Sequence, residues 1–281
     1  MKQEVALCGI GRMENRYSRE WVEHHLSHGF SRVIIYDNNC DGEDWFEDVL
    51  QDYIDDGRVE LIDYRNRRWA QIAAYNDCYR RYGNQYEWIA FLDFDEFLVT
   101  DKPLDTFLRE YCDADCVLVN WRVMTDTGQL YYDSRPVRER FTMPLGNDVL
   151  MRGEHRYNDH VKSIVRGGLQ TDVVFEKSMH VPKPPIRCCT TSHQFVDNTP
   201  FQPCDHRHAR IDHYTTKTLE EWLYVKYVRG FPCSISQRWR DQMAIPQFFE
   251  INEWTAEKEA MLKEWKRRLP LTPHGKNVNC K

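Results

Sequence analysis

The sequence predicts an α/β fold with a mostly parallel sheet covered by helices on both faces. Over roughly the first 120 residues, short apolar runs alternate with segments of helical periodicity, which is typical of strand–helix–strand units. Turn-forming clusters separate these segments. Apolar residues make up 41% of the 281 residues and aromatic residues 13%, which is enough for a substantial core. We therefore expect a single domain over residues 1–281.

Each element of the first half has its own local signal. Five strands are expected, at residues 4–9, 32–36, 58–62, 88–92 and 115–121. Four helices are expected, at residues 18–28, 44–54, 69–82 and 103–111. Ser18 is a candidate N-cap, Gly29 and Gly83 are helix stops, and Pro103 suits a first helical turn.

Beyond residue 121 the pattern becomes irregular. Strand-like pieces are expected at residues 161–165 and 173–175, a loop or lid at 182–203, and helices at 218–229 and 254–269. The strand–helix half is therefore followed by an irregular region and then by C-terminal helices.

An acidic motif follows the predicted strand at residues 88–92. Asp93 and Asp95 lie on one side of an extended chain, because side chains alternate along a strand. Clustered carboxylates repel each other, and Mg²⁺ or Mn²⁺ relieves that repulsion through hard oxygen ligands. A solvated acidic loop is the alternative interpretation.

Composition excludes several classes of protein. The net charge of -6 argues against a nucleic-acid binder, and no apolar run has the length of a membrane span. The apolar stretch at residues 5–10 is too short for a signal peptide, so we expect a cytoplasmic protein with reduced cysteines. Cys188, Cys189 and Cys204 lie near several histidines, which leaves open either a zinc site or a polar loop.

Several sequence pieces, taken in order, resemble one enzyme family. They are residues 13–16 (Met-Glu-Asn-Arg), 20–26 (Glu-Trp-Val-Glu-His-His-Leu), 35–39 (Ile-Tyr-Asp-Asn-Asn), 71–78, 91–98 (Phe-Leu-Asp-Phe-Asp-Glu-Phe-Leu), 120–121, 139–141, 162–166 and 213–221. Across residues 3–232 the chain resembles GT-A-fold glycosyltransferases of a family-2-like bacterial group related to galactan synthases, a family 92-like group.

This resemblance implies a function for each part of the chain. Residues 1–125 would form a nucleotide-sugar-binding half, 126–232 an acceptor-side half and 233–281 a C-terminal helical extension. The implied activity is a metal-dependent, inverting transfer of a hexose from a UDP-sugar donor to a glycan or lipid-linked acceptor. The implied cofactor is Mn²⁺ or Mg²⁺.

The resemblance also implies roles at the metal and the diphosphate. Asp95, with Asp93 directly or through water, would hold the metal, and His213 would be the third ligand. Lys217 would neutralise phosphate oxygens. A structural histidine and a solvated lysine remain the alternatives for His213 and Lys217.

Further residues are expected around the nucleotide. Glu14, Asp37 and Gln71 would line the base and ribose pocket. Asp37 has an alternative as an Asx-turn residue that bonds its own backbone. Asn76 is assigned to the same binding region, with simple packing between helix and sheet as its alternative.

The general base should be a carboxylate near the acceptor, beyond the metal motif. Asp126, just after the fifth strand, is the first choice. Asp133, Glu139 and Glu154 are the other candidates.

The C-terminal segment at residues 254–269 repeats apolar side chains at helical spacing and carries several basic ones. A helix packed on the core is the favoured interpretation. Peripheral contact with an anionic membrane is the alternative.

Three other functions were weighed. A phosphohydrolase using Asp93 and Asp95 would need a Gly-Thr-like continuation, whereas Glu96 and Phe97 follow. A dinucleotide oxidoreductase would need a third glycine after Gly9-x-Gly11. A non-catalytic carbohydrate-binding protein would leave the acidic strand end without a purpose.

Overall fold

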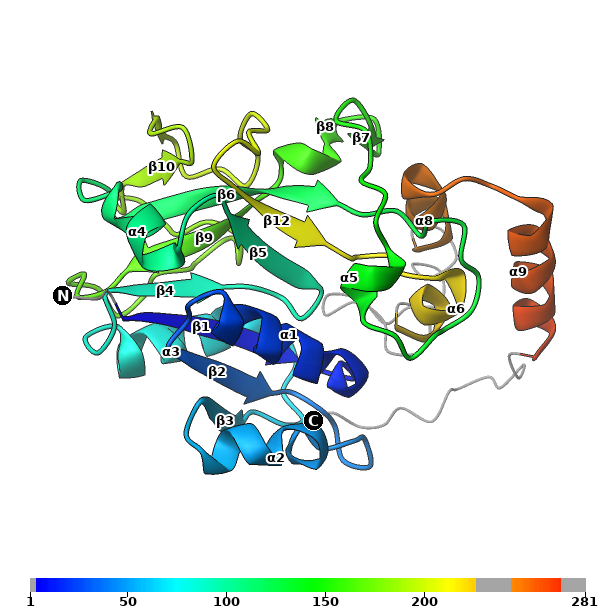
Figure 1. Cartoon of the computed structure of the whole chain (residues 1–281), viewed down its shortest axis with the longest axis horizontal. Coiled ribbons are helices and arrows are strands. Elements are labelled where there is room, and N and C mark those ends of the chain that lie inside the picture. The colour runs from blue at the N-terminus through cyan, green and yellow to red at the C-terminus, as the bar shows by residue number, and fades with distance from the viewer. Residues whose placement is uncertain (1–3, 226–243, 269–281) are drawn as a thin grey trace.

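The computed structural model describes residues 4–225 and 244–268, and its centre is a curled ten-stranded sheet (Figure 1). The strands are β1 (Val5–Gly11), β2 (Arg32–Asp37), β3 (Val59–Asp63), β4 (Trp88–Phe91), β5 (Glu96–Thr100), β6 (Cys116–Val123), β9 (Val161–Arg166), β10 (Cys188–Thr190), β11 (Phe195–Val196) and β12 (Ala209–His213). Their order is β11-β10-β6-β9-β4-β1-β2-β3, and β12 pairs with both β5 and β6. A separate hairpin joins β7 (Leu150–Met151) and β8 (His155–Arg156).

The pairing confirms the expected mostly parallel sheet. Strand β1 runs parallel to β2 and β4, and β2 runs parallel to β3, so their carboxyl ends share one edge. Strand β9 lies antiparallel between β4 and β6. In Figure 1 the arrows of β1, β2, β4, β6 and β12 point towards the same side of the molecule. Ligands of open α/β sheets bind at such an edge.

Helices cover both faces of the sheet, as the sequence predicts. The described helices are α1 (Asn15–Ser27), α2 (Glu47–Asp55), α3 (Gln71–Tyr82), α4 (Leu104–Arg109), α5 (Val137–Arg140), α6 (Leu219–Trp222), α8 (Ile245–Ile251) and α9 (Ala256–Arg268). Along β1, Val5 and Leu7 join the core under α1, α2 and α4, whereas Ala6 and Cys8 join the core under α3. This alternation follows from the two-residue period of a strand.

The expected elements of the first half are present with small shifts. Helix α1 begins at Asn15, so Ser18 is an internal residue rather than the N-cap, and its hydroxyl bonds the Asn15 carbonyl at 2.9 Å. Gly29 ends this helix as predicted, with φ of +111°. Gly11 is a packing glycine, because a Cβ there would lie 2.7 Å from the Phe94 ring.

The irregular half holds the larger errors. Strands β5 and β12 were not predicted, and residues 173–175 do not form the expected strand. The expected loop at 182–203 contains the short strands β10 and β11. Residues 226–229 of the expected helix at 218–229 lie outside the described residues.

The C-terminal helices pack on the body of the protein. Leu262 of α9 is buried in a small cluster with Trp222 and Phe248, which confirms a core-packed helix. Trp254 precedes α9 and is 54% exposed, so it does not belong to the buried stripe. No described helix is long and apolar enough to cross a membrane.

Most cysteines among the described residues are free thiols. Cys8, Cys78 and five others carry free thiols. Cys40 contradicts the expectation of reduced cysteines, because it is disulfide-bonded.

Candidate active site

The acidic motif begins at the carboxyl end of β4 and leads directly into β5. Asp93 is held on both carboxylate oxygens. Its Oδ1 accepts hydrogen bonds from Gln71 Nε2 at 2.6 Å and from the Tyr75 hydroxyl at 3.2 Å. Its Oδ2 lies 2.8 Å from Lys162 Nζ. Gln71 therefore orients Asp93, a role different from the base or ribose contact that the sequence predicts for it.

Lys162 is a site residue whose role the sequence did not reveal. It lies on β9, is fully buried, and also lies 3.3 Å from Glu96 Oε2. Glu96 in turn accepts a hydrogen bond from the Asp93 backbone N–H at 2.8 Å. Burial raises the pKa of Glu96 to about 8, although the Lys162 charge opposes this. Burial alone would lower the pKa of Lys162, but the Asp93 and Glu96 carboxylates outweigh it and the net shift is upward.

Asp95 and His213 come together at the same edge. Strand β12 pairs with β5 so that His213 lies opposite Glu96, and the Tyr214 N–H donates to the Asp95 carbonyl at 2.8 Å. This pairing brings His213 Nε2 to 3.6 Å from Asp95 Oδ1. Neighbouring ligands of an octahedral Mg²⁺ lie about 3 Å apart, so these two side chains fit one ion after a small adjustment.

The described residues do not complete a protein-only metal site. No group of three His, Cys, Asp or Glu among them has a geometry that could hold a metal. Asp93, the third predicted ligand, is instead engaged by Lys162 and Gln71. An ion at Asp95 and His213 would therefore take further ligands from a bound substrate and water.

Lys217 and Glu14 lie around Tyr17 of α1. Lys217 is buried, and its Nζ lies 4.4 Å from the centre of the Tyr17 ring. The Tyr17 hydroxyl donates to Glu221 at 2.8 Å. Glu14 is buried at the N-cap of α1, three residues before Tyr17. Lys217 is thus an ordered, buried cation, which argues against a solvated lysine.

Two predicted nucleotide contacts serve the fold instead. Asp37 is 1% exposed, and its carboxylate accepts from the Asn39 N–H at 2.9 Å and from Arg65 at 2.6 Å. The first of these bonds is the Asx-turn that the sequence left open. The Asn76 side chain bonds the backbone of Val174 and Phe175 in three hydrogen bonds of 2.7 to 2.9 Å. Asn76 therefore fixes a loop against α3, which agrees with its packing alternative.

The structure places Asp126, the first choice of general base, in an ion pair. Asp126 is buried, and its Oδ2 lies 2.6 Å from Lys258 Nζ of α9. A carboxylate committed to a buried ion pair is not free to accept a proton from a substrate. Among the other candidates, Asp133 pairs with Arg135 at 2.7 Å. Glu139 and Glu154 are exposed, and we assign no general base.

A cluster of rings borders the acidic motif. We call Trp121, His160, His180 and His213 the ring cluster. His160 stacks on Trp121 with 4.1 Å between ring centres, and the ring centre of His213 lies 4.2 Å from that of Trp121. His180 meets His160 edge-on at 4.4 Å. Its members come from β6, from β12 and from segments before and after β9. They are far apart in the sequence, so no local motif predicts the cluster.

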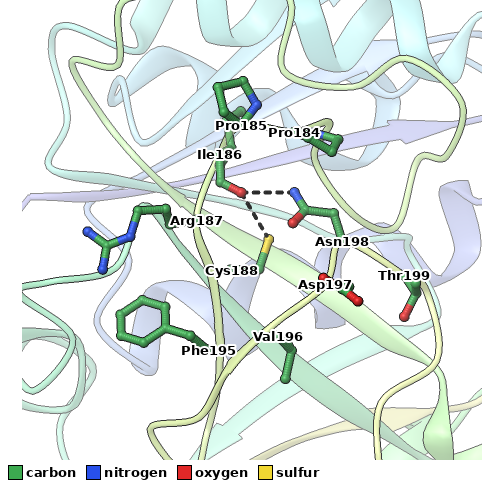
Figure 2. A pocket seen from close by; sticks show the side chains of 10 residues that line it. All are labelled: Pro184, Pro185, Ile186, Arg187, Cys188, Phe195, Val196, Asp197, Asn198 and Thr199. Atoms are coloured by element: carbon green, nitrogen blue, oxygen red, sulfur yellow. Dashed lines mark hydrogen bonds between the residues drawn. The ribbon is translucent and has the colours of Figure 1, made fainter.

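The cysteine-rich segment does not assemble into the zinc site that the sequence left open. Cys188 lines a groove with Phe195 and Asn198, and its thiol points to the Ile186 carbonyl (Figure 2). Cys204 instead lies 3.3 Å from His206 Nε2. The groove adjoins the start of β6, because Cys188 pairs with Cys116, whereas His213 pairs with Val123 at the end of that strand. The groove is therefore separate from the candidate active site.

The sheet and the charged groups at its carboxyl edge define an α/β protein of the class that binds ligands beyond its strand ends. The sequence profile of glycosyltransferase family 92 matches residues 5–240. This chain therefore belongs to glycosyltransferase family 92.

Plant relatives share part of the chain. A family 92 protein of Oryza sativa subsp. japonica is 34% identical over 113 residues, which are 38% of this chain and 18% of the relative. A galactan beta-1,4-galactosyltransferase of Arabidopsis thaliana is 32% identical over 108 residues, which are 34% of this chain and 21% of the relative. The matched region is thus about a fifth of each relative's length.

Solved structures show a more distant likeness. TarS 1–349 of S. aureus has a TM-score of 0.45 and 12% identity, covering 88% of this chain and 70% of that chain. Mannosyltransferase PcManGT from Pyrobaculum calidifontis, in complex with GDP-Man and Mn²⁺, has a TM-score of 0.36 and 14% identity, covering 43% of this chain and 36% of that chain.

Proposed function

We propose that this chain is a glycosyltransferase that moves a hexose, with inversion, from a UDP-sugar to a glycan or lipid-linked acceptor. Membership of family 92 supports this class of activity over the phosphohydrolase and the carbohydrate-binding protein. A relative named as a galactan beta-1,4-galactosyltransferase supports galactose as the first sugar to test. The observation that carries the proposal is the meeting of Asp95 and His213, from β12, at the carboxyl edge of the sheet.

Different residues of the chain would bind the metal ion and the diphosphate. Asp95 and His213 would hold Mn²⁺ or Mg²⁺, which when bound supplies Lewis-acid stabilisation of the departing diphosphate. Lys217, a buried cation near the same edge, would contribute positive charge to the phosphates. Asp93 does not need to be a direct ligand, because Lys162 and Gln71 already fix its carboxylate.

The test is a comparison of Asp95→Asn with the wild-type protein. A neutral amide balances a cation less well than a carboxylate, so the variant should lose transfer from UDP-galactose by at least a hundredfold. Its urea midpoint should stay within error of the wild type, because asparagine keeps the size of the side chain and the 3.6 Å contact with His213 is longer than a hydrogen bond. Wild-type turnover should stop on exhaustive chelation and return with Mn²⁺ or Mg²⁺. Transfer that survives chelation would contradict the metal assignment, and no transfer from any UDP-sugar would contradict the proposed function.

A further inference from the structure

The ring cluster contains more buried polar atoms than the protein itself satisfies. The Nδ1 atoms of His160, His180 and His213 and the Nε1 of Trp121 are buried and find no hydrogen-bond partner among the described residues. Each such atom costs roughly 1–3 kcal/mol when left unpaired. Four of them within one cluster mark a place that a polar ligand completes.

We propose that the ring cluster binds the hydroxyl groups of a neutral hexose. This inference rests on the proposed function and identifies the sugar-recognising part of the same site.

The chemistry of the four nitrogen atoms selects the ligand class. The indole Nε1–H of Trp121 only donates, whereas a neutral imidazole nitrogen either donates or accepts. Burial lowers the pKa of His160 to about 3 and lowers the pKa of His180 as well, so both rings are neutral at pH 7. The Trp121 N–H can only donate and so excludes a bare cation, and the neutral His160 and His180 rings offer an anion no balancing charge. Sugar hydroxyls both donate and accept, and they match a mixed set.

The position of the cluster agrees with this ligand. His160 directly precedes β9 in extended backbone, two residues before Lys162, so the two side chains leave the chain on the same side. Lys162 contacts Asp93, and His213 contacts Asp95. The cluster thus borders the acidic motif on the side of β6, β9 and β12. A sugar attached to a diphosphate at Asp95 and the sugar that accepts it would both lie near this boundary.

The chain offers a matched pair of substitutions for the test. Trp121→Phe removes the indole N–H of the ring cluster. Trp88→Phe is the control, because Trp88 Nε1 is also buried without a partner but lies at the first residue of β4, opposite the Asp93 end. Binding of UDP and of UDP-galactose is measured by calorimetry, and KM is measured for a galactan oligosaccharide. Loss of one hydrogen bond to a sugar hydroxyl should weaken binding about tenfold.

The separate measurements identify which sugar binds. If Trp121→Phe weakens UDP-galactose but not UDP, the cluster binds the donor hexose. If it raises only the acceptor KM, the cluster binds the acceptor hexose. His180→Asn, which retains a polar side chain of similar reach, should weaken the same ligand less than His180→Ala does. If Trp121→Phe changes neither quantity more than Trp88→Phe, the cluster holds water only and the proposal is wrong.

A second readout does not depend on transfer. The indole N–H signal of Trp121, assigned by its loss in Trp121→Phe, should shift in the NMR spectrum on addition of galactose or UDP-galactose, whereas the Trp88 signal should not. A chain that transfers no sugar but shows this shift would contradict the proposed function and retain the hexose site. An unshifted Trp121 signal in a chain that transfers galactose would overturn the hexose site alone.

Discussion

At the scale of single residues, Lys162 shows how the site tolerates crowded carboxylates. Asp93, Asp95 and Glu96 fall within four positions of the sequence, and Glu96 is fully buried. A buried carboxylate is stable only when it is paired or protonated. The Lys162 ammonium lies within 3.3 Å of both Asp93 and Glu96, so its positive charge stabilises the two acidic side chains. In a solvent-exposed motif, water would do this instead.

We therefore expect Lys162→Met to destabilise the fold. The substitution keeps the apolar stem but leaves Asp93 and the buried Glu96 beside an uncharged side chain, and breaking a buried ion pair typically costs about 3–5 kcal/mol. Urea unfolding at pH 7 measures this change. Lys177→Met is the matched control, because Lys177 is exposed, and it should change stability by less than about 0.5 kcal/mol. Equal stability of the two variants would show that Lys162 does not neutralise the motif.

At the scale of elements, the structure explains which segments the sequence could predict. Strands β1, β2 and β4 are buried on both faces and read as continuous apolar runs, so their positions follow from composition alone. Strand β5 begins with the polar residue Glu96 and β12 ends with the polar residue His213. The two strands pair with each other although more than 100 residues separate them in the sequence. No local window contains that pairing.

The same distinction applies to the site. Asp93 and Asp95 were found because their signal is contained in three residues at a strand end. Lys162 and the ring cluster were missed because they depend on β9 lying between β4 and β6. Asp37, Asn76 and Asp126 make structural contacts in the fold, and the sequence alone does not distinguish such contacts from ligand binding.

Helix α1 carries a pH dependence of its own. His24 is buried, its ring bonds the Leu98 carbonyl at 2.8 Å, and burial lowers its pKa to about 4. The folded state therefore binds fewer protons than the unfolded state between about pH 6.5 and pH 4. Stability is present above pH 6.5 and is lost as the pH falls through this window.

We expect the His24 contribution to fall by roughly 2 kcal/mol between pH 7 and pH 5, since one pKa unit corresponds to about 1.4 kcal/mol. His24→Gln keeps a donor near Leu98 but does not titrate, so its stability should fall less over the same interval. Urea unfolding at both pH values compares the two proteins. An identical loss in both would place the acid sensitivity in other groups, such as the buried His25 beside it.

At the scale of the whole molecule, α9 connects the C-terminal segment to the sheet. Lys258 pairs with Asp126, which follows β6, and both side chains are at most 5% exposed. The Asp126 N–H donates to Asn252 Oδ1 at 2.6 Å, so the segment before α9 holds the same loop. Leu262 adds an apolar contact to Trp222 and Phe248. The C-terminal segment is therefore part of the folded body, with Lys263 and Arg267 on its exposed side.

Truncation after Ile251 should consequently destabilise the protein. It removes Lys258 and leaves Asp126 buried without its cation, which typically costs about 3–5 kcal/mol. It also exposes the apolar surface beneath Leu262.

Asp126→Asn in the full chain separates these effects. It removes the charge but keeps α9, so it should lose less stability than the truncation and retain most transfer activity. Urea unfolding and turnover with UDP-galactose measure both variants, and Lys263→Ala on the exposed side serves as the control. A truncated chain that is as stable as the full one, yet no longer sediments with anionic vesicles, would instead assign α9 to a membrane surface. The basic side chains of α9 would then bind anionic lipid, and its apolar side chains would not stabilise the core.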